Sequence, residues 1–231
     1  QDDQLDPTHW FWDPTKSGGI WVEHGVHFLD AVHWLLGPAD WVWAAGFARP
    51  KEHLVERVAG TVGLESGCVV SYYHGFTKPE AFEDTVFALV WERAYGALHG
   101  WIPVRLTLDA LVTPEVEAYL THKALERARA YLPGVDVKLT AVQAEPLGEA
   151  ATFRGRGKNY RATARLRLTY ELSHDRWTVY RACVRQGLLD LAVAVRDPAR
   201  SPAVTLADAE AALRVAAALT ASAAGGQRVF L

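Results

Sequence analysis

The stretch SGGIWVEHGVHFLDAVHWLLG, residues 17–37, constrains what this chain can fold into more than any other part of it. Gly18 and Gly19 have no Cβ, so they predict a turn where another group can come close to the backbone just before a helix begins. The helix predicted next has an apolar stripe that can anchor it in a core. That stripe contains Phe28, Val32 and Leu35 or Leu36.

A second stripe of the same predicted helix is polar. It contains Glu23, His27 and Asp30, at positions i, i+4 and i+7 of a helix. Spacing alone leaves two interpretations open. The stripe can face a cleft and carry chemistry, or it can belong to a buried helix whose polar groups hydrogen-bond inward.

The order of residues in this stretch resembles the signature that opens the second domain of the glucose–fructose oxidoreductase / inositol dehydrogenase (Gfo/Idh/MocA) family. The usual form of that signature is G-G-G-x-L-x-D-x-G-x-H-x-x-D-x-x-x-x-L-x-G. The matching positions are Gly18, Gly19, Gly25, His27, Asp30, Leu35 and Gly37. Ser17 replaces the first glycine, and Glu23 replaces the aspartate, which moves the carboxylate one methylene further out. Residues 202–229 are similar to the last stretch of the same family, whereas residues 111–162 fit it poorly.

The resemblance implies an NAD(P)-dependent oxidoreductase acting on a CH–OH group of a sugar- or polyol-like molecule. His27 would be the general acid/base, since imidazole suits proton transfer near neutral pH. Glu23 would be its catalytic partner, while Gly18, Gly19 and His24 would contact the substrate. Asp30 would be structural.

The family's dinucleotide-binding domain is not found in these residues, because no G-x-G-x-x-G occurs in them. The family's Glu-Lys-Pro lysine is also absent. We therefore expect the substrate-binding half of a longer protein, with NAD or NADP bound by the full-length form and none by this chain alone. The first residues, Gln1-Asp2-Asp3, and the lack of any methionine also suggest a processed chain or part of a longer one.

Two other functions remain open. The chain could be a non-catalytic binding or scaffold module of the same fold. It could also be a metal-dependent enzyme with Glu23, His24 and His27 as ligands, although this is not His-Glu-x-x-His and no distant third ligand is identifiable. Our site prediction therefore contains no metal.

Composition limits the partners. The chain has 231 residues, 50% hydrophobic and 22% charged, which is enough for a core. Its net charge of −3 with dispersed basic residues argues against nucleic acid and favours a small-molecule substrate. No apolar run approaches the ~20 residues of a membrane span. Cys68 and Cys183 form no disulfide framework, so we expect a cytoplasmic protein with both thiols in the core.

The pattern predicts one α+β domain over residues 1–231, with a local elaboration at 111–162. Its sheet should be open and mostly antiparallel, with helices packed on one face. The segment Trp41–Ala48 predicts a strand with Trp41, Trp43 and Phe47 on one side. If those rings face away from the helices, the sheet face should pair two copies into a homodimer or tetramer. If they lie under the helices, the free face needs no partner.

Overall fold

The computed structural model describes residues 5–50, 54–82, 84–100, 102, 104–131, 134–148 and 151–231. These residues form two compact units, each with its own apolar core. Unit 1 contains Gln1–Glu83 and Ser201–Leu231, and unit 2 contains Asp84–Arg200. The sequence predicted one domain, whereas the structure divides the predicted run of strands between two separate sheets.

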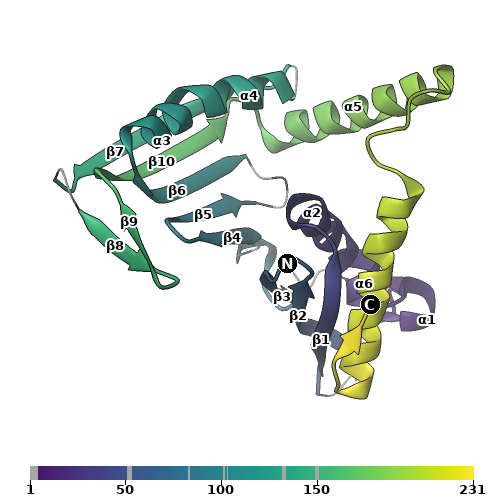
Figure 1. Ribbon diagram of the computed structural model, residues 1–231. Coiled ribbons are helices and arrows are strands. Elements are labelled where there is room, and N and C mark those ends of the chain that lie inside the picture. Colours follow the sequence, from purple (N-terminus) through teal and green to yellow (C-terminus); the bar gives the residue numbers. More distant parts are fainter. Residues whose placement is uncertain are drawn as a thin grey trace. The chain divides into compact units, whose positions relative to one another are not determined.

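Unit 1 begins with helical segments, and a long helix precedes its last strand (Figure 1). The segments are η1 (Trp10–Trp12), α1 (Pro14–Ser17), the π-helical η2 (Trp21–Gly25), α2 (Val26–Leu36), η3 (Glu80–Phe82) and α6 (Leu206–Gly225). The predicted Thr205–Asp208 capping box opens α6, and Gly226 ends it in the left-handed conformation, which glycine adopts without strain.

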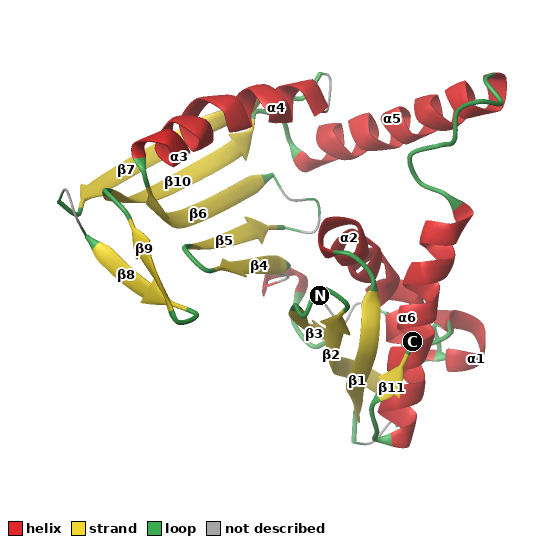
Figure 2. Cartoon of the chain, viewed as in Figure 1, coloured by secondary structure: helices red, strands yellow, loops and turns green. Residues whose placement is uncertain are grey.

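The sheet of unit 1 has four antiparallel strands in the order β11-β1-β2-β3 (Figure 2). Their bounds are β1 (Ala39–Ala48), β2 (Val55–Leu64), β3 (Val69–Gly75) and β11 (Val229–Phe230). Helices α2 and α6 pack together, and α6 packs along β1, where the Ala44 N–H donates a 3.0 Å hydrogen bond to Ser222 Oγ. The predicted hairpin of β2 and β3 is confirmed.

The two sides of β1 differ. Val42 and Ala44 are fully buried in the core that includes α6, whereas Trp43 is 42% and Phe47 46% exposed. Alternation along a strand places these two sets on opposite faces of the sheet. The bulky rings therefore face away from the helices, which resolves the alternative that the sequence left open.

Unit 2 has a five-stranded antiparallel sheet in the order β4-β5-β6-β10-β7. Its strands are β4 (Val86–Trp91), β5 (Ala94–His99), β6 (Arg105–Val112), β7 (Val137–Pro146) and β10 (Ala164–Leu172). Two short strands, β8 (Thr152–Gly155) and β9 (Lys158–Arg161), form a separate ribbon. The helical segments are α3 (Pro114–Ala118), the π-helical η4 (Tyr119–Lys123), α4 (Ala124–Tyr131) and α5 (Arg176–Arg196).

Strand β10 shows why one face of this sheet is covered. Leu166, Leu168 and Tyr170 are buried, while Arg165 and Arg167 are exposed on the other face and both contact Asp109. The apolar residues pack against the helical segment 114–131, and the Tyr170 hydroxyl donates a 2.7 Å hydrogen bond to the Leu120 carbonyl. The predicted α+β class with antiparallel sheets is thus confirmed. Helices cover one face in each unit.

Two expectations about single residues fail. Cys68 and Cys183 are both exposed thiols, because Cys68 lies beside the β2–β3 turn and Cys183 lies on a solvent-facing side of α5. Leu35 and Leu36 are also exposed at the end of α2, whereas Phe28 and Val32 are buried as predicted. No helix in the described part of the chain combines the length and apolarity needed to cross a membrane.

Candidate active site

The glycine pair forms a sharp turn between α1 and η2. Asp13 caps α1 by accepting a 3.0 Å hydrogen bond from the Thr15 N–H. Gly18 and Gly19 then adopt φ values of +76° and +87°, which side-chain-bearing residues rarely adopt. A Cβ on Gly18 would also come within 2.7 Å of Val22 Cγ1. The backbone conformation of the turn, together with the close approach of Val22, therefore requires glycine at position 18.

The helix that follows is not uniform. Ile20 starts it, the π-helical turn η2 covers Trp21–Gly25, and α2 continues to Leu36. A π turn holds more residues than an α turn and often occurs at functional sites. The sequence spacing of i, i+4 and i+7 assumed a regular α-helix, so the π turn changes the angle between the Glu23 and His27 side chains around the helix axis.

The structure places one predicted catalytic residue inside the π turn and the other just after it. Glu23 lies inside the π turn and is half-buried, and His27 is exposed in the first turn of α2. Asp30 is half-buried further along the same helix. Because the His27 imidazole is exposed on this helix, it can contact a small molecule that binds against the helix surface near Glu23.

His24 lies in a different environment, among aromatic rings. Its ring centroid is 5.2 Å from Phe28, 5.1 Å from His74 and 5.4 Å from Phe76. His74 comes from β3 and also contacts Trp21 at 5.4 Å. Any contact between His24 and a substrate must occur at the part of the ring that this cluster leaves open, so its predicted role remains a prediction.

Burial keeps both imidazoles neutral. Burial, together with the charges that His74 and His27 would carry, lowers the pKa of His24 to about 3. Burial also lowers the pKa of His74 to about 4. At neutral pH, therefore, each of these two rings can donate or accept a hydrogen bond but carries no charge.

The sequence did not single out His74 or its neighbour Tyr72. Both lie on the inward side of β3, and burial raises the pKa of Tyr72 above its usual range. His74 Nε2 and Trp21 Nε1 are buried without a hydrogen-bond partner among the described residues. A sequence signal for this position does exist. Every second residue from Val70 to Phe76 is apolar or aromatic apart from His74, and this alternation could have placed His74 in the core beside the Gly-Gly helix.

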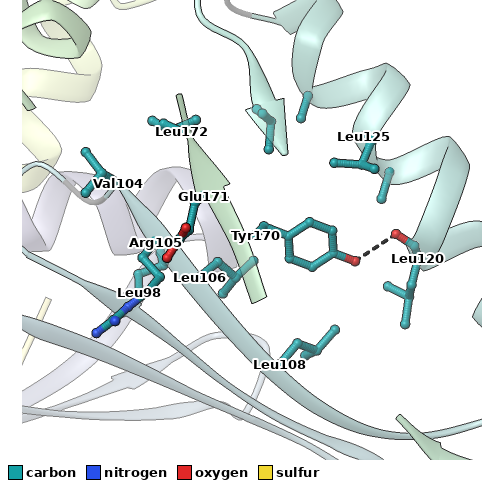
Figure 3. A pocket seen from close by; sticks show the side chains of 13 residues that line it. Leu98, Val104, Arg105, Leu106, Leu108, Leu120, Leu125, Tyr170, Glu171 and Leu172 are labelled. Carbon is teal, nitrogen blue, oxygen red and sulfur yellow. Dashed lines mark hydrogen bonds between the residues drawn. The ribbon is translucent and has the colours of Figure 1, made fainter. Parts of the chain in front are cut away.

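Unit 2 contains an apolar hollow of about 330 Å³ beneath α4 (Figure 3). Its walls are mainly leucine and valine side chains from the sheet and helix, together with Tyr170 and the charged pair Arg105 and Glu171 at neighbouring strand positions. In Figure 3 a dashed line joins the Tyr170 hydroxyl to the Leu120 carbonyl, so the proton of this hydroxyl is already donated within the protein. Such a wall offers few groups to bind the hydroxyls of a polyol, so the Gly-Gly helix remains the better candidate for the proposed chemistry.

Two kinds of cofactor site can be compared with the described residues. Within them, no group of three or more His, Cys, Asp or Glu side chains is arranged to hold a metal ion. Every strand pairing that the structure describes is antiparallel, so these residues do not build the parallel βαβ unit of a family-type dinucleotide site.

Residues 1–92 match the sequence profile described as the GFO/IDH/MocA C-terminal domain. No protein of curated function matches the chain by sequence. The fold is similar to that of an NAD-binding protein from Listeria innocua, with a TM-score of 0.59 and 14% identity over 100% of this chain and 56% of that one. It is also similar to a Thermotoga maritima protein assigned as an oxidoreductase (TM-score 0.56, 14% identity, 99% and 51%).

A third similar structure is an oxidoreductase from Agrobacterium radiobacter in complex with NAD+, L-tartaric acid and magnesium. Its TM-score is 0.54 at 15% identity, over 92% of this chain and 49% of that one. The chain thus spans about half the length of these structures. The resemblance predicted from the Gly-Gly helix is confirmed. Residues 1–92 match a C-terminal domain of the Gfo/Idh/MocA type, which is a family of oxidoreductases.

Proposed function

We propose that this chain is the substrate-binding half of an NAD(P)-dependent oxidoreductase that acts on a CH–OH group of a sugar- or polyol-like molecule. The observation that carries the proposal is the exposed His27 in the first turn of α2. It lies four residues after the half-buried Glu23 of the π turn, on a helix that follows a glycine turn matching the family signature. An exposed imidazole and a neighbouring carboxylate are the groups that proton transfer to or from a hydroxyl requires.

In this proposal His27 takes the proton from the substrate hydroxyl during oxidation and returns it during reduction. Glu23 orients the imidazole or binds a second hydroxyl, and its half-buried position limits the rotamers open to it. Gly18 and Gly19 let the substrate approach the backbone, and His24 can offer a neutral hydrogen-bonding nitrogen, since its pKa is about 3.

The nicotinamide cofactor would be bound outside the residues of this chain, because the antiparallel strands described do not supply its site. The Agrobacterium radiobacter structure supports the substrate class, since L-tartaric acid carries hydroxyl-bearing carbons and is bound there together with NAD+. Two exposed cysteines without a disulfide support a reducing, cytoplasmic location.

We also infer a homo-oligomer assembled through the open face of the unit 1 sheet. Trp43 and Phe47 of β1 are exposed on this face, and Tyr73 of β3 and Phe230 of β11 pair with residues of the same face. An exposed group of aromatic rings of this kind is typical of a protein–protein interface.

The test of the catalytic proposal is the change His27→Asn in the protein that joins this chain to a dinucleotide-binding domain. The kcat should fall by ~10²–10⁴ while nicotinamide affinity stays nearly unchanged, because only proton transfer is lost. His33→Gln, on the same helix but outside the signature, is the matched control and should keep its kcat. A His27→Asn variant with full kcat at every pH would refute the proposal and favour the scaffold module.

A further inference from the structure

The apolar hollow of unit 2 lies between two layers of the same unit. On the sheet side, Leu106 of β6 is the register partner of both Leu98 of β5 and Tyr170 of β10, so three neighbouring strands contribute one row of side chains to the wall. On the other side lies the helical segment 114–131, and Figure 3 shows the Tyr170 ring reaching from the sheet toward Leu120 of that segment. Every lining residue belongs to unit 2, so the walls are formed without unit 1.

Two alanines leave space on the helical side of the hollow. Ala124 and Ala128 are one turn apart in α4, so they lie on the same side of the helix, and both line the hollow. Leu120 and Leu125, which line it beside them, are large apolar side chains. The chain therefore carries its smallest apolar side chain at two positions where a leucine would occupy the space.

The hollow is large for a space between packed layers. Its volume is about 330 Å³. Protein interiors leave few voids larger than a water molecule. An engineered apolar cavity of ~150 Å³ stays free of water and binds benzene. A hollow roughly twice that size, lined mainly by leucine and valine, can therefore hold an apolar molecule of about ten carbon atoms.

Water is poorly suited to fill this space. At ~30 Å³ for each water molecule, the hollow has room for roughly ten of them. Each buried water needs several polar partners, and the wall offers few. Tyr170 supplies a hydroxyl oxygen whose proton is already donated to the Leu120 carbonyl. Arg105 and Glu171 carry opposite charges at paired strand positions, so they give the wall no net charge.

We propose that this hollow is a binding site for an uncharged, largely apolar small molecule of about ten carbon atoms, such as a two-ring aromatic compound. The apolar walls provide the contact area. The Tyr170 oxygen keeps a lone pair after its proton is donated to Leu120, so it can accept a hydrogen bond from one hydroxyl of the ligand. A charged or polyhydroxylated molecule would leave polar groups unpaired there. The ligand class therefore differs from the polyol proposed for the Gly-Gly helix of unit 1.

The test uses 2-naphthol as the probe, because it is a fused two-ring aromatic compound with a single hydroxyl. Titration calorimetry on the whole chain should show one site with a Kd below ~1 mM. Ala128→Leu fills part of the hollow, so it should weaken binding at least ~10-fold while the melting temperature stays the same or rises. Ala130→Leu is the matched control and should keep the affinity, because Ala130 is exposed on the same helix and does not line the hollow.

Methyl NMR on the unchanged chain gives a readout that does not depend on any substitution. With labelled leucine methyl groups, 2-naphthol should shift the resonances of Leu98, Leu106 and Leu125, which line the hollow. The resonances of Leu206 and Leu213, which are exposed on α6 of unit 1, should stay in place.

Three results would overturn the proposal. If another part of the protein fills the hollow, the titration shows no binding of 2-naphthol. Non-specific adsorption shifts the exposed Leu206 and Leu213 as much as the leucines of the hollow. A folded Ala128→Leu protein with full affinity places the probe elsewhere. The catalytic proposal fails or stands separately, because His27→Asn should leave the affinity for 2-naphthol unchanged.

Discussion

The packed pair of the half-buried His24 and the buried His74 should make unit 1 sensitive to mild acid. Both rings are neutral in the folded chain, since burial lowers their pKa values from 6.5 to about 3 and about 4. In the unfolded chain both rings return to 6.5 and take up protons as the pH falls below that value. Because protons then bind the unfolded chain preferentially, the stability contributed by the neutral rings is complete above pH 6.5. It is lost as the pH falls to about 4 for His74 and about 3 for His24.

The magnitude follows from the pKa values. At pH 5 both rings are still neutral in the folded chain, so the cost depends only on protonation of the unfolded chain. Each pH unit below 6.5 costs about 1.4 kcal/mol per ring. Lowering the pH from 8 to 5 should therefore remove about 2 kcal/mol per ring and about 4 kcal/mol for the pair. This is a large part of the 5–15 kcal/mol that stabilises a typical protein.

Urea unfolding at pH 8 and pH 5, followed by tryptophan emission, measures this loss, because Trp12 and Trp21 are buried in unit 1. The double change His24→Phe and His74→Phe should reduce the difference between the two pH values by about 4 kcal/mol. Any packing defect of the phenylalanines acts at both pH values and cancels. His122→Gln, an exposed position in unit 2, is the control. An undiminished pH difference in the double variant would refute the reasoning.

Two further predictions concern the carboxylate and the sheet face. If the carboxylate acts in the site, Glu23→Asp should keep kcat/KM within about tenfold of the unchanged protein, and Glu23→Leu should lower kcat/KM by at least ~10². A Glu23→Leu protein that is fully active and more stable would instead show that Glu23 is a surface residue without a role in the reaction. Trp43→Glu places a charge on the aromatic face, so light scattering should show a lower mass at micromolar concentration; a mass unchanged by Trp43→Glu would rule out assembly through this face.

Much of the fold could be predicted from local patterns. The alternation of β10 predicted which of its faces is buried, and the Thr205–Asp208 box predicted where α6 begins. The hairpin of β2 and β3 followed from two strand-like runs around Glu65-Ser66-Gly67. These features depend on neighbours in the sequence, such as caps, turns and period-two alternation. The sequence therefore determines them before any tertiary contact forms.

Other features were decided only by tertiary packing. Alternation divides β1 into a bulky and a small side, but only the packing of α6 on Val42 and Ala44 shows that Trp43 and Phe47 face outward. The Gly-Gly signature located His27 and Glu23, but not the π turn that contains Glu23. One ring neighbour of His24 is His74, fifty residues further along the chain, and burial by the surrounding fold lowers the pKa values of both imidazoles. Desolvation depends on everything packed around a group, so the sequence near His24 does not reveal it.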